Sequence, residues 1–149
     1  MPLSVLALAF CTILPLPETG CAPLTVRAPA ETLRVAVVSD ERARERGLMK
    51  VPELPHNQGM LFAFPDGNRV RYFWMKDTIT PLDMVFVRGD GVVTEIAAGV
   101  PATIVGAPEE TIERRAGTAR YVIEMRSGEA ARAGIRRGTR LRIPEIAAR

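Results

Sequence analysis

The stretch from residue 73 to residue 86, FWMKDTITPLDMVF, holds the only tryptophan of the chain, Trp74. Its aromatic and branched apolar residues predict a β-strand at each end of the stretch. Four polar side chains interrupt the apolar pattern: Lys76, Asp77, Thr78 and Asp83. Polar groups within a buried pattern conflict with local structure, and such conflicts occur at functional or strained sites. We therefore expect the functional site of the protein to lie between Trp74 and Asp83.

The elements around this stretch predict a mostly β fold. Short apolar runs predict strands at 33–38, 59–64, 70–75, 82–87, 92–96, 121–125 and 141–143. Ser39 or Asp40 can cap a short helix that ends at Gly47, and a second short helix is expected at 128–133. Segment 99–117, flanked by proline and glycine, is expected to be a surface loop. Because long helices between the strands are missing, the pattern predicts a compact antiparallel β-sandwich or a partly closed barrel.

Chain length and composition are typical of a single globular domain. The 149 residues are 47% hydrophobic and 25% charged, with a formal net charge of +3, which is too mild to require a nucleic-acid partner. Positive charge gathers near the C-terminus, at Arg132, Arg136, Arg137, Arg140 and Arg142. Because no aromatic residues lie between these arginines, a solvated basic face or contact with anionic lipid headgroups fits them better than nucleic acid. A monomer is expected.

The beginning of the chain differs in composition from the rest. The run LSVLALAFCTIL at 3–14 is too short to span a bilayer easily and matches the hydrophobic region of a signal peptide. We expect residues 1–21 to be a signal peptide or lipoprotein leader, 22–31 a linker and 32–145 a single β domain. The protein is then exported to a periplasmic or other extracytoplasmic space, and lipidation of Cys21 would anchor it to a membrane. A buried N-terminal strand or helix is the alternative.

The cysteine and histidine content restricts cofactor chemistry. Cys11 and Cys21 are the two cysteines, and His56 is the one histidine. A zinc site of the His/Cys type is therefore disfavoured, no cofactor is expected, and His56 is interpreted as an ordinary loop residue. A hard cation held by carboxylates remains an alternative.

Several motifs of the chain occur together in a known family. They are RERGLM at 44–49, GMLFAF at 59–64, FWMKDT at 73–78, PLDMVF at 81–86 and YVIEM at 121–125, followed by Gly128, Gly134-Ile135 and Gly138. With this set of motifs the chain, over roughly residues 32–143, resembles the domain of unknown function 192 family, an uncharacterised group common in bacteria and archaea. The resemblance implies a compact, mostly β fold, often behind an export signal, and no established activity. Asp77 departs from the family, where asparagine is more common.

Eight residues are candidates for the site: Arg44, Arg46, Trp74, Lys76, Asp77, Thr78, Asp83 and Glu124. The first hypothesis is a non-enzymatic module that binds a small molecule, a polymer or a protein in a polar pocket around Trp74–Asp83. The alternative is a carboxylate- or metal-assisted hydrolase that uses Asp77, Asp83 and Lys76, since paired carboxylates support general acid–base chemistry.

A second alternative is a structural accessory domain without a pocket. In that case Asp77 and Thr78 cap a turn, and Asp83 pairs with an arginine such as Arg44 or Arg46. Glu124 either points outward from its strand or adds a third carboxylate to the pocket.

Overall fold

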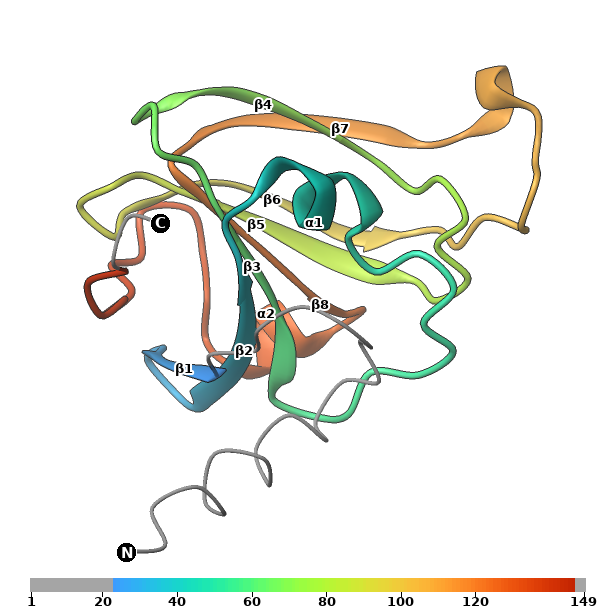
Figure 1. The fold of residues 1–149 in the computed structure, drawn as a ribbon. Coiled ribbons are helices and arrows are strands. Elements are labelled where there is room, and N and C mark those ends of the chain that lie inside the picture. Colours follow the sequence, from blue (N-terminus) through green and yellow to red (C-terminus); the bar gives the residue numbers. More distant parts are fainter. Residues whose placement is uncertain (1–22, 147–149) are drawn as a thin grey trace, which may run out of the picture.

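The computed structural model describes residues 23–146, which form two β-sheets (Figure 1). The strands in this part of the chain are β1 (Pro23–Arg27), β2 (Thr32–Val38), β3 (Gln58–Ala63), β4 (Arg69–Trp74), β5 (Leu82–Val87), β6 (Val93–Val100), β7 (Arg114–Ala119) and β8 (Tyr121–Arg126). The helices are α1 (Glu41–Arg46), α2 (Glu129–Arg132) and the short 3-10 helix η2 (Glu109–Thr111). The larger sheet has the order β1-β2-β3-β8-β5-β6, and β4 pairs with β7 in the smaller one. The expected leader at 1–21, with Cys21, lies outside the described residues.

The expected fold class is confirmed: the described residues form two sheets with two short α-helices and do not close into a barrel. Neighbouring strands of the larger sheet are antiparallel except for β2 and β3, which are parallel. A parallel pair needs a crossover connection, and residues 39–57 supply it. This crossover carries α1, where Asp40 Oδ1 accepts a hydrogen bond from Ala43 N at 2.9 Å and Gly47 ends the helix with a φ of 48°.

The larger sheet separates two apolar cores. In β5, Met84 and Phe86 belong to one core, whereas Val85 and Val87 belong to the other, because successive side chains of a strand point to opposite faces. The first core includes residues of α1 and of the β4–β7 sheet, and the second includes residues of α2 and the C-terminal segment. Figure 1 shows α1 and the β4–β7 sheet on one side of the larger sheet and α2 on the other.

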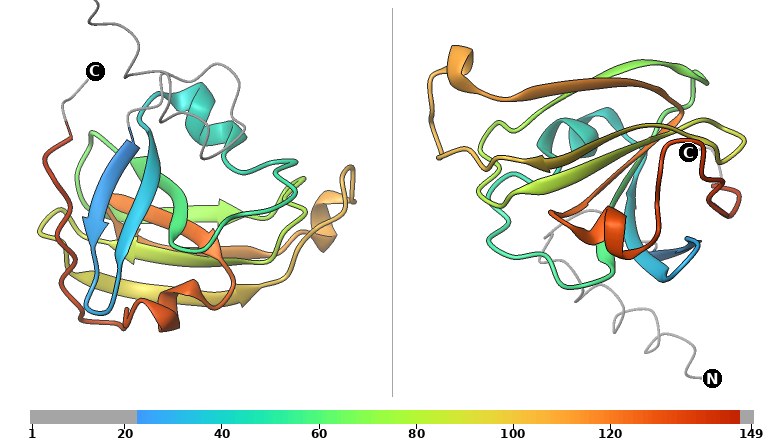
Figure 2. Two further views of the ribbon diagram at one scale, coloured as in Figure 1. Left: turned by 90° about the horizontal axis from the view of Figure 1, so that it is seen from below. Right: turned by 180° about the vertical axis from the view of Figure 1, so that it is seen from behind.

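A close backbone approach holds the smaller sheet against the larger one. A Cβ built on Gly117 of β7 would lie 2.5 Å from Cγ of Phe86, so a side chain at this position would collide with the ring. Phe73 of β4 meets Phe62 and Phe86 edge to face, with ring centroids 4.9 and 6.0 Å apart. Figure 2, viewed from behind, shows the β4–β7 pair running over β5 and β6. These contacts pack the β4–β7 sheet closely against β3 and β5 of the larger sheet.

The structure differs from the sequence-based expectation in three places. The expected linker at 22–31 contains β1, which pairs along β2, and its proline content concealed this strand. The expected loop at 99–117 contains most of β7, whose sequence RRAGTA has few β-branched residues. The expected last strand at 141–143 contributes only an isolated bridge between Arg27 and Arg142. No helix within residues 23–146 is long and apolar enough to cross a membrane.

Candidate functional site

A cleft of about 480 Å³ opens between α1 and strand β4. Its walls come from α1 and the turn after it, from the ends of β3 and β4, and from the segment that follows β4. Six of the eight predicted site residues line this cleft: Arg44, Arg46, Trp74, Lys76, Thr78 and Glu124. Asp77 and Asp83 do not line it. The volume lies within the range of small-molecule sites, about 300–1,000 Å³.

The cleft is lined at its base by a buried carboxyl group. Glu124 in β8 is 4% exposed, and its register partners, Met60 in β3 and Met84 in β5, are buried and apolar. No hydrogen bond or ion pair joins the Glu124 carboxyl to another residue in the described part of the chain. Burial raises the pKa of Glu124 to about 8. Glu124 is therefore mainly a neutral acid at pH 7, with unused hydrogen-bonding capacity next to the cleft.

Aromatic rings in the cleft walls carry cationic side chains. The Arg71 guanidinium lies 4.0 Å from the centroid of the Phe64 ring, and the Arg44 guanidinium lies 5.0 Å from the same centroid. Lys76 Nζ lies 4.9 Å from the centroid of the Trp74 ring. Each such contact contributes about 0.5–1 kcal/mol at an exposed site. Two aromatic rings of the cleft wall, Phe64 and Trp74, are thus each in contact with cationic side chains.

Hydrogen bonds to the backbone fix the two arginines beside Phe64. Arg71 donates to Ala119 O at 3.1 Å and pairs with Asp66 at 2.5 Å, and the Arg71 hydrogen bond is the main reason why the pKa of Asp66 lies below its ordinary value. Arg44 donates to the carbonyls of Ala63, at 3.1 Å, and Ser39. Both guanidinium groups therefore serve as parts of the wall.

Lys76 differs from these arginines because its ammonium group reaches solvent. Within residues 23–146 the Lys76 ammonium contacts the Trp74 ring, and the side chain is otherwise exposed. The turn beneath it is rigid: Thr78 is 5% exposed, donates through Oγ1 to Lys76 O at 3.1 Å, and donates through its backbone N–H to Met75 O at 3.0 Å. A fixed turn with an exposed cation at the rim of a cleft is suited to an anionic group of a ligand.

Asp83 faces away from the cleft, toward α2. Its carboxylate is 1% exposed and accepts three backbone N–H groups: Gly99 at 2.8 Å, and Gly128 and Ala130 at 3.0 Å each. A hollow of about 390 Å³ adjoins Asp83, but both carboxylate oxygens are already bonded to the chain. The expected ion pair between Asp83 and Arg44 or Arg46 is wrong, because the alternation of β5 places Asp83 on the face opposite to these arginines.

Asp77 also bonds to the backbone. It has a φ of 50°, its Oδ1 accepts from Gly106 N at 2.9 Å, and its carbonyl oxygen accepts from Lys50 N at 2.8 Å. Asp77 thereby ties the turn after β4 to the loop before η2 and to the crossover. The two aspartates do not converge on a common space, so the geometry does not support the predicted hydrolase centre of Asp77, Asp83 and Lys76.

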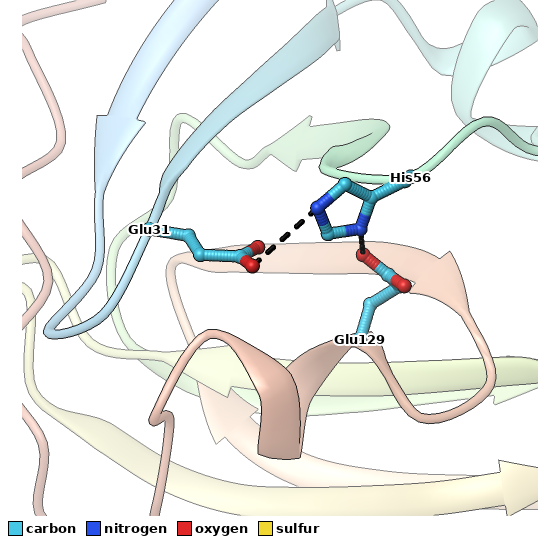
Figure 3. Close-up of side chains that lie close together, drawn as sticks. All are labelled: Glu31, His56 and Glu129. Carbon is cyan, nitrogen blue, oxygen red and sulfur yellow. Dashed lines mark hydrogen bonds and ion pairs between the residues drawn. The ribbon is translucent and has the colours of Figure 1, made fainter.

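Three ionisable residues from distant parts of the chain meet outside the cleft (Figure 3). His56 Nδ1 lies 2.6 Å from Glu129 Oε2, and His56 Nε2 lies 3.4 Å from Glu31 Oε1. Glu129 is 2% exposed and also accepts from Asn57 N at 2.9 Å and from Arg126 at 3.0 Å. The cluster of Glu31, His56 and Glu129, which we call the histidine clamp, fastens the crossover to α2 and to the turn between β1 and β2.

The histidine clamp has the donor types of a metal site, with the three ligand atoms within 4.8 Å of one another. Arg126 lies 3.0 Å from Glu129, and Arg132 lies 3.8 Å from both Glu31 and Glu129. The two arginines balance the two carboxylates, so a divalent cation would add uncompensated positive charge. Burial opposes ionisation of Glu129, but the hydrogen bonds from Asn57, Arg126 and His56 outweigh it and hold its pKa below the ordinary value. We interpret the clamp as an ion-pair network. His56 is therefore more than the ordinary loop residue expected from the sequence.

Fold and site together define a small two-sheet β domain with a ligand-sized cleft, a buried acid in its lining and a cationic, aromatic rim. The model of the DUF192 family, which is described as an uncharacterised ACR, matches residues 23–143. The chain belongs to this family, as its motifs predicted. No curated protein matches the chain.

Two solved structures are similar over most of their length. One, from Sinorhizobium meliloti 1021, is provisionally named a transcription regulator; it is 31% identical with a TM-score of 0.73, and the match covers 85% of this chain and 97% of that one. The other, a protein of unknown function from Novosphingobium aromaticivorans DSM 12444, is 30% identical with a TM-score of 0.69, and the match covers 85% of this chain and 89% of that one.

Proposed function

We propose that the protein is a non-enzymatic module that binds a small molecule in the cleft between α1 and β4. The observation that carries this proposal is the Glu124 carboxyl, which is 4% exposed and has no partner among the described residues. Among the described residues the fully buried side-chain atoms without a partner are Glu31 Oε2 and Gln58 Oε1, so the Glu124 oxygens are open to the cleft and not sealed in the core. A ligand in the cleft can therefore supply a hydrogen-bond partner to the Glu124 carboxyl.

The walls of the cleft support binding rather than turnover. The rings of Phe64 and Trp74 offer apolar surface, and Lys76 adds an exposed charge. The carboxylates of Asp77 and Asp83, which a hydrolase would use, accept backbone N–H groups instead. The other acids that line the cleft are Glu41 and Glu45, which are exposed on α1, and Asp66, which is paired with Arg71, so none of them forms a carboxylate pair with the buried Glu124.

We further propose that binding takes place outside the cytoplasm, by a monomer held near a membrane. The apolar run at 3–14 and Cys21 support export and lipidation. The C-terminal arginines support contact with anionic headgroups, although Arg140 donates to Asp90 O at 3.0 Å and Arg137 lies 4.0 Å from Glu95. Cell fractionation of the wild type and of Cys21→Ser tests this: wild-type protein is expected with membranes and the variant in the soluble exported fraction. Wild-type protein in the cytoplasm would refute it.

The test of the binding proposal uses Trp74 as a built-in reporter, because it is the only tryptophan and lines the cleft. A panel of small organic anions, amines, sugars and neutral aromatics is screened by Trp74 fluorescence and by amide chemical shifts. At least one compound is expected to shift signals of Phe64, Lys76 and Glu124 together. Glu124→Leu should lower the affinity for that compound, whereas Glu110→Gln, an exposed substitution on η2, should leave the affinity unchanged. The proposal fails if no compound shifts these signals.

A further inference from the structure

We propose that the ligand of this cleft is a small organic anion, with its charged group at Lys76 and a neutral hydrogen-bond acceptor at Glu124. This inference rests on the proposed binding function of the cleft and names its ligand class. Glu124 would donate a hydrogen bond to the acceptor of the ligand, and Lys76 would attract its negative charge. Between them, the Phe64 and Trp74 rings would cover an apolar or aromatic body.

The first step concerns the protonation of Glu124. Its neighbours on adjacent strands, Met60 and Met84, are apolar, and burial is the sole cause that raises its pKa to about 8. At neutral pH the carboxyl therefore keeps its proton and presents one O–H donor. A ligand carbonyl, hydroxyl or ring nitrogen can accept this hydrogen bond while the buried Glu124 carboxyl stays neutral.

The second step concerns the other charges around the cleft. Besides Glu124, the acids among the lining residues are Glu41 and Glu45, which are exposed on α1, and Asp66, which is paired with Arg71. The cations are Arg44, Arg46, Arg71 and Lys76. None of these four cations lowers the pKa of Glu124. The cations therefore act at the opening, while the environment of Glu124 stays neutral and apolar.

The arrangement favours an anion over an amine. An ammonium group would have to pass the cationic rim and would need Glu124 to ionise in an apolar environment, which burial opposes. An anionic group is attracted by Lys76 and can remain at the rim, where water still solvates part of it. Only its neutral end then needs to reach Glu124. Charge and burial thus assign different ends of one ligand to different depths of the cleft.

The experiment uses fragments in matched triplets with the wild-type protein. One triplet is 4-acetylbenzoate, which has both features, 4-isopropylbenzoate, which lacks the acceptor, and 4-acetylbenzylamine, which replaces the anion by a cation and is compared with the other two at pH 6. Amide chemical shifts give the affinities at pH 6 and pH 9. Across the triplets, fragments with both features should bind best. Their affinity should fall about 10-fold between these pH values, as Glu124 with a pKa of about 8 loses its proton.

Two variants separate the roles of the side chains. Glu124→Gln keeps an N–H donor but cannot titrate, so binding should remain and its dependence on pH should disappear. Lys76→Met should remove the preference for anions and keep the preference for acceptors. The inference is overturned if amines bind best, or if Glu124→Gln abolishes binding, since an ionised carboxylate would then be the partner. If sugars or neutral aromatics shift the cleft signals and the anions do not, this inference fails while the binding function stands. If nothing binds in the cleft, both fail.

Discussion

Glu124 of β8 and Met84 of β5 are register partners, so a carboxyl and a thioether side chain lie next to each other on the face of the larger sheet that lines the cleft. Met60 occupies the equivalent place on the other side, in β3. Apolar neighbours in both directions explain why the Glu124 carboxyl keeps its proton. They also make the Glu124 carboxyl costly to ionise on an otherwise apolar face, and the proposed role in binding would account for its presence there.

The first prediction is that Glu124 makes stability decline as the pH rises. Its pKa is about 8 in the folded protein against an ordinary value of 4.5, so the folded state holds a proton that the unfolded chain releases above pH 4.5. Below pH 4.5 Glu124 does not reduce the free energy of unfolding. Between pH 4.5 and pH 8 it reduces this free energy by about 1.4 kcal/mol per pH unit. Urea unfolding at pH 5 and pH 8 should show the wild type losing on the order of 3 kcal/mol more than Glu124→Gln. Equal losses in both proteins would contradict the assigned proton.

The second prediction is that Asp83 contributes to stability and Asp77 contributes little as a charge. Asp83→Asn should cost about 2–4 kcal/mol, because an amide cannot accept on both sides and turns a donor toward the N–H groups of Gly99 or of Gly128 and Ala130. Asp77→Asn is the matched control. Asparagine tolerates the φ of 50° and still accepts from Gly106, so its unfolding free energy should stay within about 0.5 kcal/mol of the wild type. A cost for Asp77→Asn as large as the one expected for Asp83→Asn would show that the charge matters at both positions, and a negligible cost for Asp83→Asn would show that it matters at neither.

The third prediction concerns acid and the histidine clamp. The pKa of Glu129 is lowered in the folded protein, so its stabilising effect is present above pH 4.5 and is lost as the pH falls through the lowered pKa. Glu129→Gln should be less stable by about 1–3 kcal/mol at pH 7 and should lose less stability than the wild type below pH 4.5. Thermal unfolding at pH 7 and pH 3.5 measures this. Hydrogen exchange at the Asn57 N–H, which donates to Glu129, should become faster in the variant. Unchanged exchange there would show that the clamp does not restrain the crossover.

The fourth prediction is that a methyl group at Gly117 strains the packing of the smaller sheet against the larger one. In Gly117→Ala the new Cβ would approach the Phe86 ring to 2.5 Å, and the overpacking should cost about 1–3 kcal/mol. Gly89→Ala serves as the control, because its Cβ would come closest to the side chain of Arg120, at 3.1 Å, which can move aside, and would lie 3.8 Å from Asn68 Oδ1. Urea unfolding should distinguish the two variants, and Trp74 fluorescence should change only in the first. A neutral Gly117→Ala would mean that the β4–β7 sheet can shift at little cost.

Local chemistry explains which parts of the fold could be predicted from the sequence. Asp40 and Gly47 mark the ends of α1 because caps depend on neighbouring residues alone. β1 was missed because of the prolines in and around it, although Thr25 and Val26 favour a strand. β7 was missed because RRAGTA is poor in strand-forming residues, and its pairing with β4 overrides this composition.

The candidate site shows a similar limit. Four of its residues, Trp74, Lys76, Thr78 and Glu124, were predicted because they lie within or interrupt apolar runs, and Arg44 and Arg46 were named as candidate partners of Asp83. Asp83 itself was placed on the wrong face. Its alternation with Met84 contained the correct answer, since neighbouring residues of a strand cannot share a face. The contact between His56 and Glu129 joins positions 73 residues apart, and neither side chain has a local signal for it. A contact between residues so far apart in the sequence depends on the order of the strands in the sheet, which local sequence patterns do not specify.

The crossover at 39–57 joins two parallel strands and supplies one wall of the cleft through α1. Its α1 wall belongs to a connection and not to a strand of the sheet, so residues can be exchanged or inserted there without shifting the register of any strand. Relatives with the same sheet could therefore acquire different ligand preferences by remodelling this one connection. For protein engineers, it is the natural segment to randomise when a new specificity is sought on an unchanged framework.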